Sequence, residues 1–383
     1  MLAVTSTKPS LQLLSSLTDE HVLRALMAHE RLTRAELATE TGISRPTISE
    51  SVRRLDAADL VRDTGVRTTG RGRVGSYYAL APDLGGALVV GIAPEGVVAE
   101  VVDVRGAVVG RSVRPVPHTT RSGRVRRALD AAVAEACDQS TLPVVLSVVS
   151  AADPVDRESG RLIHLPDAPF LVGDLDPVSV LRPHASGPVI VDNDVNWAAR
   201  AESAAAGPGE LDDFAYVHLG EGLGCAVVSD GEVRRGHHGL TGEITHVLTT
   251  GPGGRSVPLT EVFELVGMRT AGTSAVDVSA LLSRVDSGGA SARRLLEVLG
   301  AAVSGVLASV VAFADPRVIV VGGGWGTHPQ VLSAVEESFA RLPRRAPVRA
   351  ARVTDEPALA GARRRALLAL QDQIVARVHD VAG

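Results

Sequence analysis

Cysteine, internal repeats and long apolar runs are scarce or missing in this chain of 383 residues. Its two cysteines, Cys137 and Cys225, are too few for a disulfide framework and lie in apolar segments, which is typical of the reducing cytoplasm. The chain starts without a charged segment followed by an apolar one, so we expect no secretory signal. No apolar run reaches the ~18 residues that span a bilayer, and we therefore expect a cytoplasmic protein with no membrane partner. The absence of short repeats excludes a solenoid.

Hydrophobic residues make up 45% of the chain and charged residues 22%, which is the balance of an ordinary folded protein. The length predicts two or three domains. The net charge is −5 at pH 7, but it is unevenly distributed. Residues 1–80 hold eleven basic and nine acidic side chains, and within 44–78 there are seven arginines and four acids. A small basic module on an acidic body is typical of a DNA-binding protein.

The first 60 residues show the pattern of a helix-turn-helix. Apolar residues recur at helical spacing within 11–30. Thr33 is placed to cap a helix over 34–40, and Gly42 can take the positive φ of the tight turn that follows. These signals predict two helices that meet at a sharp turn.

A further helix is predicted over 45–57, where Ser44 can act as the cap and Pro46 falls in the first turn. Residues 64–80 predict two short strands joined by an Arg/Gly-rich loop, as in a wing, and a boundary follows at 81–83. The expected buried face of the helices consists of Leu37, Ala38, Ile43, Ile48, Val52 and Leu55.

From residue 86 the pattern changes to strands that alternate with helices. A strand hairpin followed by alternating helices and strands occurs twice, which predicts two α/β lobes with a cleft between them. The predicted strands are 87–93, 96–104, 107–116, 144–149, 188–193, 214–220, 225–231 and 318–324, and the predicted helices are 122–137, 194–206, 276–312 and 357–380.

Five segments carry a family resemblance: TRAELATETGISRPTISESVRRLDAADLV (33–61), GRGR (70–73), VDNDVNWAARAE (191–202), GHHGLTGEITH (236–246) and VAFADPRVIVVGGG (311–324). Together they resemble the ROK family of repressors, open reading frames and kinases, in particular its xylose- and N-acetylglucosamine-repressor branch. The resemblance implies a winged helix-turn-helix over 1–82 and an α/β domain of the two-lobed actin/hexokinase-like type over 83–383. Lobe one would take in about 86–190 and the helix 357–380, and lobe two about 191–356.

A recognition helix offers polar side chains near its N-terminus to the major groove. Arg45 is the best candidate for a contact to a base edge, whereas the arginines farther along are expected at phosphates or in the minor groove. The alternative is that these are only solvated surface residues. The expected DNA-binding residues are Ser44, Arg45, Thr47, Ser49, Arg53, Arg71 and Arg73.

The resemblance also implies a sugar pocket. In the family's kinases an Asn-Asp pair after a strand binds the sugar and the aspartate is the general base, and these positions are Asn193 and Asp194 here. Glu243 and His246 carry over from the family's Gly-Glu-Ile-Gly-His motif as ligands of sugar hydroxyls, and Glu261 is the match for a further glutamate. Asp194 could instead be only a helix cap, and Glu243 and His246 a polar pair in a loop.

The zinc ligands usual in the family are missing. ROK proteins usually hold zinc with one histidine and three cysteines, but Pro252, Gly254 and Leu259 stand at the cysteine positions here. We therefore expect no metal and no cofactor, and we expect the apolar residues within 259–263 to hold this loop by packing.

Both phosphate-binding loops of the kinases have also changed. In the first hairpin Ala93 replaces the acid, Pro94 removes an N–H, and Glu95 adds a negative charge. In the second loop Glu221 sets another carboxylate against the place of a triphosphate. We therefore expect no kinase activity, with Asp194 left as a vestigial base.

These features predict a sequence-specific DNA-binding transcriptional regulator, with repression as its expected mode and a sugar or sugar derivative as its effector. It would bind a palindromic double-stranded operator as a homodimer or homotetramer. Two alternatives stay open. One is a bifunctional sugar kinase with a DNA-binding arm, which the intact Asp194 favours. The other is a regulator whose vestigial or retuned pocket binds no sugar, which Asp153, Asp167 and Thr245 favour.

Overall fold

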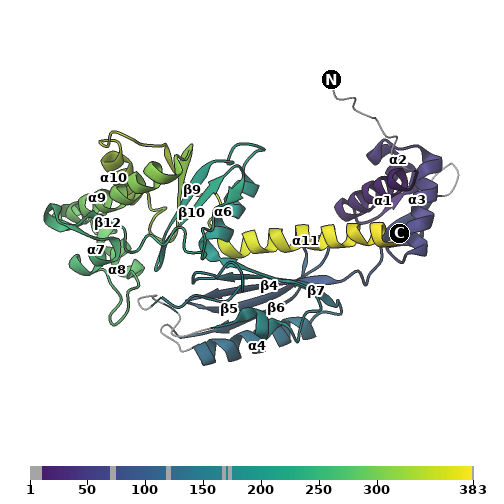
Figure 1. Ribbon diagram of the computed structural model, residues 1–383, viewed down its shortest axis with the longest axis horizontal. Coiled ribbons are helices and arrows are strands. Elements are labelled where there is room, and N and C mark those ends of the chain that lie inside the picture. The colour runs from purple at the N-terminus through teal and green to yellow at the C-terminus, as the bar shows by residue number, and fades with distance from the viewer. Residues whose placement is uncertain (1–10, 70–74, 118–121, 166–169, 171–174, 382–383) are drawn as a thin grey trace, which may run out of the picture.

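The chain folds into an elongated molecule with a small domain at one end and two α/β lobes at the other (Figure 1). The computed structural model describes residues 11–69, 75–117, 122–165, 170 and 175–381. A long helix, α11 (Pro357–Val381), runs from between the lobes to the small domain.

The N-terminal domain is a winged helix-turn-helix, as the caps predict. Thr33 and Glu36 form a capping box at the start of α2, Gly42 takes a φ of 70° after it, and the Ser44 side chain caps α3. The strands form an antiparallel sheet in the order β1-β3-β2. The elements are α1 (Leu11–Ala28), β1 (Leu32–Thr33), α2 (Arg34–Thr41), α3 (Arg45–Ala57), β2 (Val61–Arg67) and β3 (Ser76–Leu80).

The first lobe is built on a five-stranded sheet in the order β6-β5-β4-β7-β8. Its hairpin strands are antiparallel, whereas β4, β7 and β8 run parallel to one another. Helix α4 packs on β5 and β6, and α11 packs on β4 and β7. The elements are β4 (Gly86–Ala93), β5 (Gly96–Val102), β6 (Val108–Pro115), α4 (Ser122–Asp138), β7 (Val144–Ala151), α5 (Pro177–Leu181) and β8 (Val189–Asn193).

The second lobe repeats this topology with the order β11-β10-β9-β14-β15. The sequence patterns did not predict α10 or the β12–β13 hairpin. The elements are α6 (Asp194–Ala205), β9 (Phe214–Leu219), β10 (Leu223–Ser229), β11 (Glu232–Val233), β12 (Leu248–Thr250), β13 (Ser256–Pro258), α7 (Leu259–Leu265), α8 (Val278–Asp286), α9 (Gly289–Ala314), β14 (Val318–Gly322), α10 (Pro329–Phe339) and β15 (Val348–Ala350).

The change from one lobe to the other comes directly after Asn193, since β8 pairs with β7 of the first sheet through that residue. Helix α6 follows at once and packs along α11. The two helices approach so closely that a Cβ on Gly361 would lie 2.0 Å from the Trp197 carbonyl oxygen. Trp197 is buried here and donates its indole N–H to the Val149 carbonyl at 2.9 Å.

Helix α9 departs from the expectation that no apolar stretch is long enough to cross a bilayer. It contains an 18-residue window with a mean hydropathy of 2.1, of which 50% is buried in the second lobe. It packs against α10 and β12, and residues such as Leu299, Val303 and Leu307 lie in the lobe core. This burial is what a core helix shows, so the hydropathy by itself does not indicate a membrane span.

A buried ion pair fastens α11 to the first lobe. The Glu100 carboxylate on β5 is fully buried and accepts hydrogen bonds from Arg363 Nε at 2.6 Å and Nη2 at 2.8 Å. Arg111 on β6 also bonds Glu100, and both arginines reach Glu356, one residue before α11. A bidentate contact of this kind sets both the position and the rotation of the helix.

The other end of α11 belongs to the core of the winged-helix domain. Ile374 and Val378 lie in the same continuous apolar cluster as Val22 and Leu26 of α1. Polar contacts support this junction, since Arg24 pairs with Asp372 at 3.4 Å, Arg105 donates to the Glu30 carbonyl at 2.9 Å and Arg377 donates to the Leu84 carbonyl at 3.2 Å. The helix therefore connects the lobes to the winged-helix domain by packed side chains along its length.

We expect Glu100→Gln to destabilise the chain by about 3 kcal/mol, because it breaks a fully buried ion pair and leaves Arg111 and Arg363 to share Glu356. Urea unfolding followed by tryptophan fluorescence measures this, since Trp197 packs against α11. The matched control is Glu210→Gln, which removes the surface pair between Glu210 and Arg352 and should change little. Equal effects of the two variants would contradict the anchoring role of Glu100.

Candidate functional site

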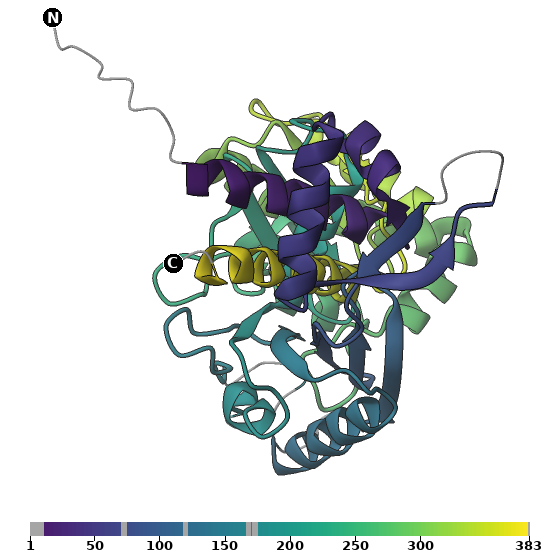
Figure 2. The ribbon, with the colours of Figure 1, turned by 90° about the vertical axis from the view of Figure 1, so that its right-hand side faces the viewer.

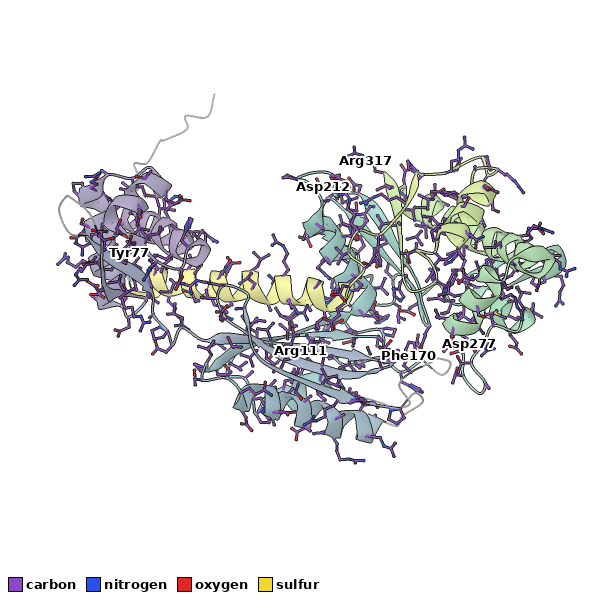
Figure 3. The ribbon with its side chains drawn as sticks, turned by 180° about the vertical axis from the view of Figure 1, so that it is seen from behind. Tyr77, Arg111, Phe170, Asp212, Asp277 and Arg317 are labelled. Atoms are coloured by element: carbon purple, nitrogen blue, oxygen red, sulfur yellow. The ribbon has the colours of Figure 1, made fainter. Side chains whose placement is uncertain are left out.

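A cavity of about 670 Å³ lies between the two lobes. Its walls come from the β4–β5 hairpin, the end of β7, the β8–α6 junction, the β9–β10 turn, the loop at 242–245 and the first turn of α11. Figure 3 labels Phe170, a lining residue on the side of the first lobe, and Asp277, the neighbour of the lining residue Val278, on the other side. Such a volume fits a small organic ligand.

Asn193 and Asp194 lie together at the cavity, as predicted for sugar-binding residues. Asn193, rather than Asp194, is the N-cap of α6, because its Oδ1 accepts a hydrogen bond from the Val195 N–H at 3.0 Å. Its Nδ2 donates to the Asp153 carbonyl at 3.2 Å. Asp194 Oδ1 accepts from the same Val195 N–H at 2.7 Å. Both side chains stay partly exposed to the cavity.

Glu243 also lines the cavity, and the backbone conformation of the preceding residue, Gly242, places it there. Gly242 has a φ of 97°, and a Cβ on it would lie 1.6 Å from the Cys225 carbonyl oxygen. Only glycine permits this approach, in which the Cys225 N–H donates to the Gly242 carbonyl at 2.9 Å. The loop is thereby held against β10 with Glu243 and Thr245 facing the cavity.

His246 and Glu261 do not line the cavity, so the structure does not bring them to the predicted sugar site. A turn closed by the Val247 N–H and the Ile244 carbonyl at 3.1 Å buries Ile244 and leaves His246 exposed. Glu261 lies half-buried in the first turn of α7. The family resemblance implied five sugar ligands in one site. The described structure places three of them, Asn193, Asp194 and Glu243, at the cavity.

Asp153 is a cavity residue that the predicted sugar-binding set omitted. Its side chain is 2% exposed, and its Oδ2 has no hydrogen-bond partner among the described residues. Burial raises its pKa to about 7, and the carboxylates of Asp194 and Glu243 add to the shift. The sequence did mark this residue, because Asp153 stands where the family's usual loop sequence has a different residue.

Asp194 shows the same kind of shift. Burial raises its pKa to about 7, and Glu95 contributes to this in part, while the hydrogen bond from the Val195 N–H opposes it. Both Glu95, at the β4–β5 turn, and Glu221, at the β9–β10 turn, line the cavity, as expected from the altered phosphate loops. The side of the cavity formed by the β4–β5 and β9–β10 turns, where the phosphate loops of the kinases would lie, therefore carries two carboxylates.

The segment at the zinc-loop positions is the β12–β13 hairpin. Thr249 donates its hydroxyl to the Ala302 carbonyl at 2.6 Å, and a Cβ on Gly305 would lie 2.2 Å from the same hydroxyl oxygen, so the hairpin packs tightly on α9. Leu259, Val262 and Phe263 are buried in the lobe core, as the packing hypothesis predicted. Within the described ranges no group of three His, Cys, Asp or Glu side chains is placed to hold a metal ion.

Helix α3 presents the predicted DNA-binding side chains on the outer domain, which lies in front of the lobes in Figure 2. Ser44, Arg45, Thr47 and Arg53 are exposed, whereas Ser49 is half-buried. The Ser44 and Thr47 hydroxyls bond each other at 2.8 Å, and Arg53 donates to Glu50. Arg71 and Arg73 lie outside the described residues.

A buried ion pair sets how α3 sits on α1. Asp19 of α1 accepts hydrogen bonds from Ser51 Oγ at 2.5 Å and from Arg54 Nη2 at 2.6 Å. Two arginines that the sequence patterns did not single out stack on wing tyrosines, Arg31 over Tyr77 and Arg34 over Tyr78. Polar and stacking contacts thus join α3 to α1, and the start of α2 to the wing strand β3.

We expect the contribution of Asp153 to the stability of the chain to fall as pH rises from about 4 to about 7, because its raised pKa means that it binds its proton more tightly in the folded chain than in the unfolded chain. Keeping Asp153 ionised in the folded chain costs at most ~4 kcal/mol, at 1.36 kcal/mol per pKa unit. This cost applies in full above pH 7 and vanishes below pH 4, and Asp153→Asn should remove it. Chemical denaturation of both proteins at several pH values measures the difference. Asp156→Asn is the control, since hydrogen bonds from Ser159 lower the pKa of that exposed carboxyl and give the opposite sign. A pH-independent difference for Asp153→Asn would contradict this.

Two family profiles match the chain. The ROK family matches residues 90–261 and 266–371, and the family of winged helix-turn-helix DNA-binding domains matches residues 16–62. Among curated relatives, an N-acetylmannosamine kinase of Escherichia coli O1:K1 is 30% identical over 192 residues, or 48% of this chain and 62% of the kinase. A bifunctional enzyme NanE/NanK of Brucella suis is 31% identical over 154 residues, or 40% of this chain and 29% of that enzyme. The chain thus spans less than two thirds of these relatives.

Solved structures share the fold. The crystal structure of a ROK family transcriptional regulator, a homologue of the E. coli MLC protein, superposes with a TM-score of 0.65 at 19% identity and covers 96% of this chain and 99% of its own. A ROK hexokinase from Thermus thermophilus superposes with a TM-score of 0.57 at 26% identity and covers 75% of this chain and 99% of its own. With its winged helix-turn-helix and its two-lobed domain, this chain belongs to the ROK family.

Proposed function

We propose that this chain is a sequence-specific DNA-binding transcriptional regulator, with repression as its mode, whose affinity for DNA depends on a sugar or sugar derivative in the cleft. One observation carries the proposal. Helix α11 lines the cavity with Pro357, Ala358 and Leu359 and, at its other end, packs Ile374 and Val378 into the core of the winged-helix domain.

This helix gives a physical path from ligand to DNA. A ligand that binds one arrangement of the lobes better than another shifts the balance between them, and it does so by its difference in affinity. Helix α11 is fastened to the first lobe and shares a core with the winged helix, so a rotation of one lobe against the other would displace the winged helix relative to the second lobe. The affinity for a palindromic operator would then depend on the spacing of two winged helices in a homodimer or homotetramer.

A DNA-binding regulator acts in the compartment that holds the chromosome. The two free cysteines fit the reducing environment of the cytoplasm. We therefore also propose a cytoplasmic location. The described residues contain no group that would hold a metal, and we propose that regulation needs no bound metal or other cofactor.

The second candidate function is a sugar kinase. Asn193 and Asp194 at the cavity favour it, as do the relatives named as kinases. Against it stand Pro94, which lacks an N–H for phosphate, and the carboxylates of Glu95 and Glu221 on the phosphate side. Like charges around a triphosphate in a concave site oppose its binding, which is why the regulator is the leading proposal.

We expect Arg45→Ala to weaken operator binding about tenfold or more, because Arg45 is exposed at the start of α3, where a contact to a guanine edge is strongest. Operator selection from random duplexes followed by a mobility-shift titration measures this. Arg317→Ala removes an equal charge from the second lobe, far from the Tyr77 end of the molecule in Figure 3, and should bind DNA as wild type does. Unselective, equal binding of DNA by all three proteins would refute the DNA-reading role.

We expect no phosphate transfer when the chain is incubated with Mg-ATP and a panel of hexoses and N-acetylhexosamines, because the cleft opposes a triphosphate. Release of ADP in a coupled assay is the measurement. The control is Asp194→Asn, which removes the cavity carboxylate at the position of the family's general base. Turnover that this substitution abolishes would establish the kinase alternative.

A further inference from the structure

A second buried carboxylate lies where the chain passes from one lobe to the other. Asp192 is the penultimate residue of β8, is 3% exposed, and directly precedes the cavity residues Asn193 and Asp194. Strand β8 belongs to the sheet of the first lobe, but two arginines of the second lobe pair with Asp192. Arg200 on α6 places its Nη1 2.8 Å from Oδ2, and Arg235 places its Nε 3.2 Å from Oδ1.

Arg235 belongs to a loop that reaches from the second lobe to the first. This loop covers residues 234–247, between β11 and β12, and we call it the strap. It brings Glu243 to the cavity. It also packs on the first lobe, where a Cβ on Gly239 would lie 2.0 Å from the Val155 carbonyl oxygen. The strap therefore contacts the candidate ligand site and the first lobe at the same time.

The strap is closed on itself between Arg235 and Glu243. The Thr241 N–H donates to the Arg235 carbonyl at 3.4 Å, and a Cβ on Gly236 would lie 2.3 Å from the Thr241 hydroxyl oxygen. Gly242 follows with its φ of 97°, which sets Glu243 at the cavity. These contacts link the two ends of the turn, so a displacement of Glu243 can reach Arg235.

The Arg235 side chain is incompletely paired in this arrangement of the lobes. Its Nη2 donates to the Val191 carbonyl at 3.4 Å, but its buried Nε makes no aligned hydrogen bond with any described residue, although Asp192 Oδ1 is near. That oxygen already accepts from the Asn193 N–H at 2.9 Å and from the Asn196 amide at 2.8 Å. A buried donor without an aligned acceptor costs free energy. A rotation between the lobes that aligned Nε with Asp192 would remove this cost.

Contacts continue from Asp192 to the winged helix. The Arg200 guanidinium, which Asp192 holds, stacks on the Trp197 ring with 4.6 Å between Cζ and the ring centroid. Trp197 is buried against α11, where a Cβ on Gly361 would lie 2.0 Å from the Trp197 carbonyl oxygen. Helix α11 ends in the core of the winged-helix domain. Side chains in direct contact thus lead from the strap to that domain.

We propose that Asp192 and Arg235 form a latch between the lobes: a ligand that contacts Glu243 completes their ion pair and thereby moves the winged helix relative to the second lobe. This rests on the proposed function of the cleft as the effector site. Both are positioning residues, since neither is among the described residues that line the cavity. Their effect is on the coupling between ligand and operator rather than on a contact to either one.

The coupling is measured as the ratio of the operator dissociation constants of the full chain with and without an excess of sugar. Thermal unfolding first shows which of xylose, glucose, N-acetylglucosamine and N-acetylmannosamine raises the Tm of the wild type. We expect that sugar to change wild-type operator affinity about fivefold or more, and Arg235→Gln to bring the ratio to within about twofold of one. The same sugar should still raise the Tm of the variant, because Arg235 does not line the described cavity.

The chain offers a matched control beside the latch. Arg234→Gln removes the neighbouring arginine, which pairs with Asp230 at 2.7 Å on the surface, and should keep the wild-type ratio. Arg235→Gln leaves Asp192 its contacts to Arg200 and Asn196, so we expect this variant to fold. Asp192→Asn should lose the ratio as Arg235→Gln does, and the double variant should lose no more than either single one, because both substitutions break one pair.

The outcomes separate the latch from the function on which it rests. If no sugar changes the Tm or the operator affinity of the wild type, the sugar effector is overturned and the latch falls with it. If a sugar acts on the wild type and acts equally on Arg235→Gln, the effector stands and the latch is wrong. Loss of the ratio in Arg234→Gln, or loss of the Tm shift in Arg235→Gln, would also overturn the latch. The first would mean a general effect of charge on the strap, and the second a role in holding the ligand.

Discussion

The position of α11, and with it the link between the cleft and the winged helix, depends on the buried carboxylate of Glu100. It holds Arg363 in a bidentate contact, and Arg363 sits on the helix that connects the cleft to the winged helix. A charge inside a lobe core is tolerated only because two arginines satisfy it. The same contact that compensates this charge also sets the rotation of α11, so stability and the geometry of signalling share one ion pair.

The cleft shows the opposite condition. Glu100 is compensated by two arginines, whereas Asp153 Oδ2 has no hydrogen-bond partner among the residues that the structure describes, and burial raises the pKa of both Asp153 and Asp194 to about 7. Like charges gathered between two lobes favour an arrangement that keeps them apart. A ligand whose contacts differ between two arrangements of the lobes would stabilise one over the other. The cost built into the free cleft is thus a source of differential affinity for its ligand.

Sequence patterns predicted much of this structure where local chemistry decides it. The capping residues Thr33 and Ser44 define α2 and α3 at the positions where the structure has them, because a cap acts within one turn. The Asn193 and Asp194 pair reached the cavity for a similar reason, since both residues follow a strand and start a helix. The patterns failed where a loop's path decides. A turn leaves His246 exposed, and Asp153 lies beside Asn193, Asp194 and Glu243, which are 40 or more positions away in the sequence.

By itself the sequence determined most of the helices and strands, the winged helix, the two-lobed plan and the acidic change in both phosphate loops. These are set by periodicity, by caps and by residue identity, which act over a few residues. Only the tertiary structure decided that carboxylates from two lobes line one cavity, that Asp153 is buried beside Asp194 and Glu243, and that α11 belongs at once to the cleft and to the winged-helix core. The physical reason is that desolvation and charge interaction depend on which distant segments meet, and sequence distance does not encode this.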